Sequence, residues 1–123
     1  MIKQDKDLVY KDICARLPYD VIVHVTDPST RTHDTYLHEA ILARLGNNQA
    51  IVKPYLRPMF NMTEEEYKEY SKLWDLQDKF PTDADIRFKI DVFDWLNVHH
   101  FDYRGLIPKG LAIEVTEANN PYK

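Results

Sequence analysis

The chain has 123 residues, of which 44% are hydrophobic and 29% are charged, a balance that indicates one compact folded domain over 1–123 and excludes a disordered chain. Its net charge is −4, with eight basic against seven acidic residues in 1–60 and eight against thirteen in 61–123. No basic run is present, so nucleic acid is the less favoured partner. The acidic half is better explained as a solvated helix face than as a patch that meets a basic partner.

The sequence has no feature typical of membrane insertion or export. Its longest apolar stretches are a few residues, far short of the about 20 needed to span a bilayer, and its first residues are polar. The single cysteine, Cys14, excludes an internal disulfide and is in keeping with a reducing compartment. We therefore expect a cytoplasmic protein without a membrane partner.

The first segments predict a helix and then a strand. Apolar residues recur at helical spacing near 5–16, and Pro18 ends this helix. From 20 to 26, β-branched residues alternate with others, which predicts a strand near 20–26. The alternating valines are Val21, Val23 and Val25. The letters DPST at 27–30 close the strand with turn-forming residues.

The next segment is compatible with a helix or with a strand. Leu37, Ile41 and Leu45 are four residues apart, and the glycine that follows suits a helix C-terminus. The same residues also share one face of a strand, and GNNQ before AIVK is typical of a hairpin. Because the preceding strand needs an antiparallel neighbour and connections are usually short, we expect a strand near 35–45 and another near 50–53.

The middle of the chain predicts an extended path followed by a long helix. Pro54 and Pro58 favour an extended backbone. Thr63 is a predicted N-cap, and Glu66 three residues later completes a capping box. These signals predict a helix near 63–79, and they explain the three successive glutamates without a metal.

The last third predicts one more helix and one more strand. Alternating apolar residues at 86–92 predict a short extended entry into a helix near 90–100. A last strand is expected near 111–115, and the tail 117–123 is expected to be frayed. The predicted core seam around the helix is Trp95, Leu96, Phe101 and Leu106. The predicted fold class is therefore α+β, a small antiparallel sheet packed with helices.

The stretch NVHHFDYRG at 97–105 is the part of the chain that most resembles a site. His99 and His100 are neighbours and point about 100° apart on a helix, so they do not suit one metal ion. The chain has no nucleophile elbow, phosphate loop or dinucleotide fingerprint. We therefore expect no metal, no cofactor and no catalytic residues.

A histidine paired with Asp102 could still orient an imidazole for acid–base chemistry. The structural interpretation is favoured, because histidines in a last helical turn can bond the free carbonyls there, while Asp102 and Arg104 hold the next turn as a local pair. Two tyrosines and two arginines could alternatively give stacking and phosphate contacts to nucleic acid. The candidate binding residues are Tyr55, Arg57, His99, His100, Asp102, Tyr103 and Arg104.

Three phrases carry a resemblance: ICARLPYD at 13–20, KPYLRPMFNMTEEE at 53–66 and FDWLNVHHFDYRGLIPKGLA at 93–112. Together they resemble a group of uncharacterised small proteins encoded by phages and prophages of gut Bacteroidales. Asp20 stands where glycine is expected in that group, and this departure argues against a tight turn there. The resemblance brings no catalytic residues. It implies a phage or mobile-element protein in a bacterial cytoplasm.

Three classes of function stay open. The favoured class is a non-enzymatic phage or mobile-element protein that binds a host or phage protein, as a host-modulating or accessory factor. Small size, acidity and an aromatic content of 12% favour it. The alternatives are a nucleic-acid-binding accessory protein and a small enzyme that uses a His–Asp pair. The oligomeric state is left open.

Overall fold

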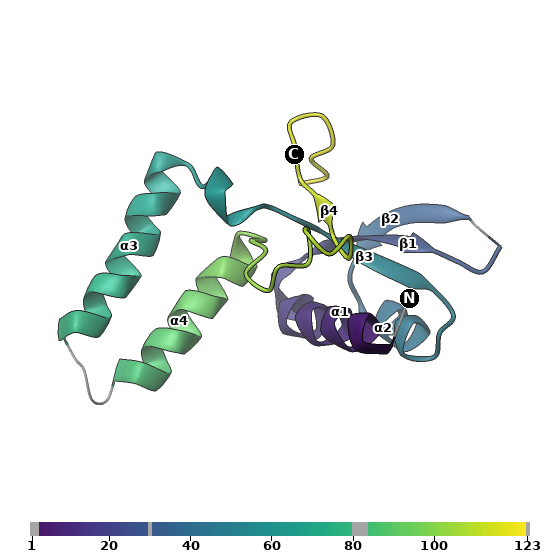
Figure 1. Ribbon diagram of the computed structural model, residues 1–123, viewed down its shortest axis with the longest axis horizontal. Coiled ribbons are helices and arrows are strands. Elements are labelled where there is room, and N and C mark those ends of the chain that lie inside the picture. The colour runs from purple at the N-terminus through teal and green to yellow at the C-terminus, as the bar shows by residue number, and fades with distance from the viewer. Residues whose placement is uncertain (1–2, 30, 80–83, 123) are drawn as a thin grey trace.

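The computed structural model describes residues 3–29, 31–79 and 84–122, and among these the side chains outside 75–90. Within this range the chain forms an α+β fold of four α-helices, two short 3-10 helices and a four-stranded sheet (Figure 1). The elements are α1 (Lys3–Arg16), η1 (Leu17–Tyr19), β1 (Ile22–Thr26), β2 (Thr32–Tyr36), α2 (Glu39–Gly46), β3 (Ile51–Leu56), η2 (Met59–Asn61), α3 (Glu64–Lys79), α4 (Ala84–Val98) and β4 (Ile113–Glu114).

The sheet has the strand order β2-β1-β3-β4. β1 pairs antiparallel with β2 and with β3, whereas β4 pairs parallel with β3. The sheet is therefore mostly antiparallel, as expected, and only the pairing of β4 with β3 is parallel. β1 lies between β2 and β3, and its valines Val23 and Val25 are fully buried beneath the helices, as expected for a strand with one covered face.

A tight turn joins β1 to β2, as the letters DPST predict. Oδ1 of Asp27 accepts hydrogen bonds from the backbone N–H groups of Ser29 and Arg31, each at 3.0 Å. The backbone N–H of Asp27 also donates to the carbonyl of Arg31 at 3.0 Å. This side-chain bonding is how aspartate stabilises turns, and it fixes the register of the hairpin.

The strand expected near 35–45 is wrong, because residues 39–46 form α2. β1 already has its antiparallel neighbour in β2, so the following residues are free to adopt the helix that their propensity favours. Ile41, Leu42 and Leu45 are buried on one side of this helix. The periodicity was helical, and the supposed need for a neighbouring strand at this position misled the prediction.

The extended entry expected at 86–92 is also wrong, since α4 begins at Ala84 and runs to Val98. It packs along α3, and Val92 and Leu96, four residues apart, are both buried on its inner face. The packing of α4 against α3 therefore favours a helix here, although the alternation of apolar residues is typical of an extended segment.

Asp20 ends η1 with φ 56 and ψ 37, the left-handed conformation. The departure from glycine therefore does not prevent a turn, because aspartate tolerates this region better than most residues. The turn leads directly into β1.

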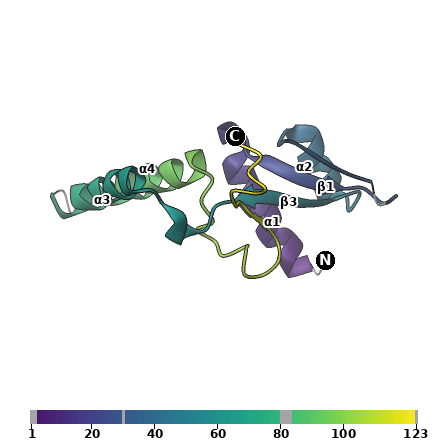
Figure 2. The ribbon, with the colours of Figure 1, turned by 90° about the horizontal axis from the view of Figure 1, so that it is seen from above.

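Three apolar clusters are buried among the described residues. The smallest consists of Ile22, Tyr55 and Val115, and the other two lie in separate parts of the molecule. The larger cluster fills the space between the sheet and the helices α1 and α2. The smaller one lies within the hairpin of α3 and α4, which projects from the sheet and its two helices in both Figure 1 and Figure 2. The expected seam is divided between them: Leu96 and Phe101 are buried in the hairpin cluster and Leu106 in the larger one, while Trp95 is only partly buried. No helix among the described residues has both the length and the apolar character to cross a bilayer.

The segment expected to be frayed folds back onto the sheet as far as residue 122. The hydroxyl of Tyr122 donates to the carbonyl of Tyr55 at 2.8 Å and accepts from the N–H of Ile22 at 3.0 Å. Asn119 closes a turn by accepting from the N–H of Thr116 at 2.6 Å. These bonds hold the segment across the face of the sheet that α1 and α2 leave open.

Candidate functional site

The candidate binding residues gather where the end of β3 meets the end of α4. The backbone N–H of Arg57 donates to the carbonyl of His100, and the N–H of Asp102 donates to the carbonyl of Arg57, each at 2.8 Å. These two bonds form an isolated parallel bridge between Arg57 and Phe101. The helical hairpin is thereby joined to the sheet through its backbone.

α4 ends in a Schellman motif. His100 has φ 63, its N–H donates to the carbonyl of Asn97 at 3.1 Å, and the N–H of Phe101 donates to the carbonyl of Leu96 at 2.9 Å. Leu96 and Phe101 also belong to one apolar cluster, which is the contact that accompanies this motif. The expected cap made by histidine side chains is therefore wrong, because the backbone satisfies the last carbonyls.

The imidazole of His100 stacks on the ring of Tyr122, with centroids 4.0 Å apart and planes at 9°. Its Nδ1 is buried without a hydrogen-bond partner among the described residues. Burial, followed by the nearby charges of Arg16, His99 and Arg57, lowers the pKa of His100 to about 4. The ring is therefore uncharged at neutral pH and acts there as an aromatic surface.

Arg57 and His99 converge on one carboxylate, that of Glu66 at the start of α3. Two guanidinium nitrogens of Arg57 donate to its oxygens at 2.6 and 2.7 Å, and Nδ1 of His99 lies 3.3 Å away. The hydrogen bonds from Arg57 are the largest cause that lowers the pKa of Glu66 to about 2. Glu66 also completes the predicted capping box, accepting from the N–H of Thr63 at 2.9 Å.

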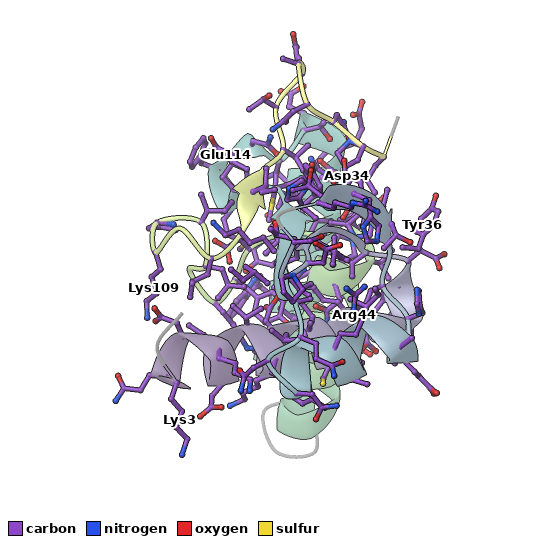
Figure 3. The ribbon with its side chains drawn as sticks, turned by 90° about the vertical axis from the view of Figure 1, so that its right-hand side faces the viewer. Lys3, Asp34, Tyr36, Arg44, Lys109 and Glu114 are labelled. Atoms are coloured by element: carbon purple, nitrogen blue, oxygen red, sulfur yellow. The ribbon has the colours of Figure 1, made fainter. Side chains whose placement is uncertain are left out.

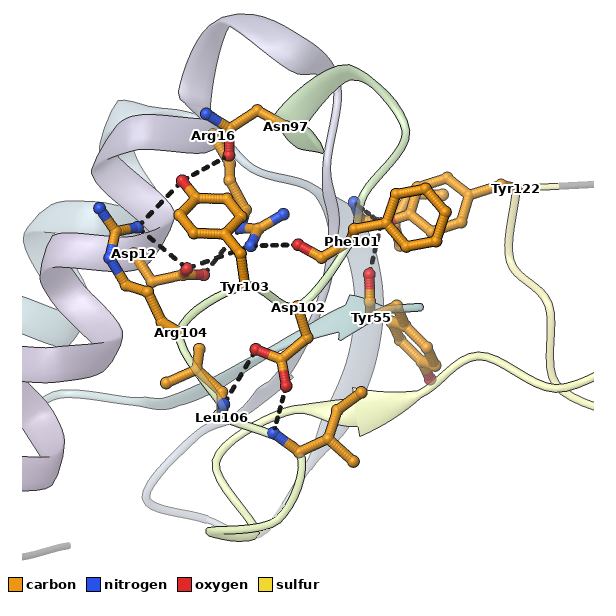
Figure 4. A network of polar contacts seen from close by, with 12 residues as sticks. Asp12, Arg16, Tyr55, Asn97, Phe101, Asp102, Tyr103, Arg104, Leu106 and Tyr122 are labelled. Carbon is orange, nitrogen blue, oxygen red and sulfur yellow. Dashed lines mark hydrogen bonds and ion pairs between the residues drawn. The ribbon is translucent and has the colours of Figure 1, made fainter. Parts of the chain in front are cut away.

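A second polar network lies between α1 and the segment after α4, with Arg104 at its partly exposed edge (Figure 4). Asp12 and Arg16 have no exposed side-chain area, and Nε of Arg16 donates to Oδ2 of Asp12 at 2.8 Å. Nη2 of Arg16 donates to the carbonyl of Phe101 at 2.7 Å, and Nη1 of Arg104 donates to Oδ1 of Asp12 at 3.1 Å. The hydroxyl of Tyr103 donates to the side-chain oxygen of Asn97 at 2.8 Å.

Asp102 fixes the following turn, but not through Arg104. Its two carboxylate oxygens accept the backbone N–H groups of Leu106 and Ile107, each at 2.9 Å. This confirms that Asp102 holds the next turn, and Leu106 of that turn is buried in the larger core cluster. The expected local pair with Arg104 is wrong, because Arg104 reaches Asp12 on α1 instead.

A histidine–aspartate pair does occur, at positions that the sequence analysis missed. Nδ1 of His24 lies 2.7 Å from Oδ1 of Asp34, and the hydroxyl of Tyr55 lies 3.1 Å from each oxygen of that carboxylate. His24 and Asp34 are directly opposite in the register of β1 and β2, on the sheet face away from α1 (Figure 3). Placing the next strand directly after the DPST turn, at 32–36 rather than near 35–45, would have revealed the pair, because the turn then sets the register.

The two arginines proposed for phosphate contacts are engaged within the protein. Arg57 binds Glu66 and lies 4.3 Å above the ring of Phe101, and Arg104 binds Asp12 and lies 4.9 Å from the ring centroid of Tyr103. Each guanidinium therefore has an acidic partner within the protein. The arrangement stabilises the junction of hairpin and sheet.

An apolar groove that the sequence analysis did not single out lies beside this junction, between η2 and the first turns of α3. It has a volume of about 420 Å³. Phe60 is 87% exposed at its edge and Tyr67 is 63% exposed. The lining residues are Met59, Phe60, Met62, Thr63, Glu64, Tyr67 and Tyr70. The sequence MFNM, which lies between a proline and the capping box, was the available signal. It contains three large apolar residues that belong to no predicted helix or strand.

In the part of the chain that the structure describes, no three histidine, cysteine, aspartate or glutamate residues are grouped as metal ligands. Comparisons with the models of protein families, with curated proteins and with solved structures find no match.

Proposed function

We propose that the protein acts by binding another protein, and that the groove between η2 and α3 holds the partner. The exposure of Phe60, at 87%, is the observation that carries this proposal. Fully burying a phenylalanine side chain contributes about 1.5–3 kcal/mol. Methionine and aromatic residues are enriched at protein interfaces, and this groove combines them.

The groove is held in shape without a partner. Glu66 and Thr63 cap the start of α3, and Arg57 joins Glu66 to the end of β3. Tyr70 packs on Trp95, with ring centroids 5.5 Å apart, and so ties α3 to α4 at the groove floor. A site that is already ordered loses little conformational entropy when a partner binds, which favours affinity.

We also propose a phage or mobile-element protein that acts in the cytoplasm of a bacterium, as an accessory or host-modulating factor. The support is the three phrases at 13–20, 53–66 and 93–112 that resemble proteins of Bacteroidales phages. The partner is then a protein of the host or of the phage. A lysate of a Bacteroidales host is accordingly the source in which to seek it.

The experiment is affinity capture from that lysate, after mild cross-linking, with the full chain as bait. The groove variant is Phe60→Ser/Tyr67→Ser, which removes exposed rings and should leave folding intact. The matched control is Tyr36→Ser/Ile51→Ser, which removes two other exposed apolar side chains, 60% and 45% exposed, from β2 and β3.

We expect the parent and the control to retain the same protein and the groove variant to lose it. The melting temperatures of all three should be measured alongside, so that a loss of binding is not confused with unfolding. Equal recovery of that protein by the groove variant would remove the groove from the function.

A further inference from the structure

We infer that the partner segment entering the groove is basic, with lysine or arginine side chains beside one or more large apolar residues. This rests on the proposed function and specifies the chemistry of the partner. The apolar floor of the groove accounts for the large apolar residues of the partner. The negative charges around the groove account for its basic residues.

The negative charge of the protein is concentrated on the hairpin that carries the groove. Residues 64–98 contain ten acidic and five basic residues, whereas the rest of the chain contains ten acidic and eleven basic residues. The hairpin therefore carries a net charge of −5 and the remainder of the chain +1, which together give −4. A field of one sign attracts a partner of the other sign and raises its association rate.

The carboxylates nearest the groove are not neutralised within the described structure. Glu64 lines the groove and Glu65 is exposed beside it, and neither forms an ion pair there. Glu66, by contrast, is occupied by Arg57. The start of a helix contributes only about half a positive charge, so two free carboxylates leave the rim negative.

A second copy of the chain is a poor match for this groove. Its own hairpin would bring a surface of the same sign, and its remaining residues carry a net charge of only about +1, with ten acidic against eleven basic residues. Like charges facing each other across an interface are unfavourable. A basic segment of a different protein fits both the apolar floor and the acidic rim.

The test selects ligands from a displayed library of random peptides, with the full chain as target and Phe60→Ser/Tyr67→Ser as the counter-selection. The peptides recovered are then measured by fluorescence anisotropy at about 50 mM and about 300 mM salt. The charge variant is Glu64→Lys/Glu65→Lys. Its control is Glu39→Lys/Glu114→Lys, which makes the same change of charge on exposed side chains of α2 and β4.

We expect the recovered peptides to combine basic residues with a large apolar residue. The charge variant should weaken their binding about tenfold or more, and the control should leave it within about twofold. Versions with glutamate in place of the basic residues should bind the charge variant better than they bind the parent. This reversal cannot arise from misfolding of the variant.

Recovered peptides that are neutral or acidic, no recovered peptides, or equal binding by both charge variants would overturn the inference. Capture from the lysate tests the proposed function separately. If capture from the lysate still depends on Phe60 and Tyr67, the groove binds a protein whose charge we have assigned wrongly. If capture does not depend on them, the proposed function itself fails.

Discussion

At the scale of single residues, Asp12 and Arg16 form a fully buried ion pair on α1. Asp12 accepts three hydrogen bonds from two guanidiniums, those of Arg16 and Arg104. Both members of the pair are fully buried, and Nη1 of Arg16 has no partner among the described residues. Removing a buried charge from water is costly, and only its partners offset that cost. The pair therefore specifies one arrangement of α1 against the segment after α4.

Replacing Asp12 by alanine should lower the free energy of unfolding by about 3–5 kcal/mol, because Arg16 is left buried without a counterion. Arg104→Ala should cost much less, since the Arg104 side chain is partly exposed and Asp12 keeps its bonds to Arg16. Urea denaturation of both variants beside the parent measures the difference. Equal losses in the free energy of unfolding for the two variants would contradict the prediction that stability depends more on Asp12 than on Arg104.

His100 should make stability depend on pH between about 4 and 6.5. Burial lowers its pKa in the folded protein from 6.5 to about 4, so the unfolded chain binds a proton in this window and the folded chain does not. Stability therefore falls as pH falls from 6.5 toward 4, by up to about 1.4 kcal/mol per pH unit for one proton.

The matching variant is His100→Asn, because asparagine tolerates the left-handed backbone at φ 63 and does not titrate. Urea denaturation at several pH values should give a shallower slope for this variant than for the parent. His33→Asn, on the exposed strand β2, serves as the control for replacing a histidine by asparagine. The contribution of Glu66 falls in a separate window, lost as pH drops from 4.5 toward 2.

At the scale of elements, the turn after α4 depends on a single carboxylate. Asp102→Ala removes the acceptor of two backbone N–H groups, of which that of Leu106 is buried. The expected loss is about 2–3 kcal/mol in the free energy of unfolding. Asp102→Asn keeps one acceptor oxygen and should cost about half as much. Thermal or urea denaturation decides, and an unchanged Asp102→Ala variant would show that the turn forms without this residue.

Local signals in the sequence were sufficient where an element depends on its own residues. The valines of β1, the aspartate of its turn and the capping box of α3 each satisfy a short-range requirement, and all three are confirmed. α2 was mistaken for a strand because the expected position of a neighbouring strand was allowed to override helix propensity. Contacts such as that of Asp12 with Arg104 join residues 92 apart, and no spacing rule brings them together.

At the scale of the whole molecule, the apolar clusters of the sheet and of the helical hairpin differ in size among the described residues. The cluster under the sheet contains fifteen buried residues, whereas the one in the hairpin contains three among the residues described. We expect backbone amides of β1 and β3 to exchange hydrogen more slowly than those of α3 and of α4 before its last turn, because small clusters open with less free energy. Hydrogen exchange followed by mass spectrometry or NMR tests this. Equal protection in both parts would mean that the molecule opens only as one unit.

The buried pair of Asp12 and Arg16 also affects the order in which the chain can complete its fold during translation. Asp12 and Arg16 are made early, yet Arg16 bonds to a carbonyl 85 residues later and the N–H of Ile22 bonds to a side chain 100 residues later. Contacts so distant in sequence form slowly, and on a growing chain they must wait for their partners to leave the ribosome. α3 and α4, whose contacts with each other are local, can pack beforehand. The sheet and its two helices therefore acquire their final arrangement only after residue 122 has been synthesised, and until then α1 lacks the later contacts that enclose Asp12 and Arg16.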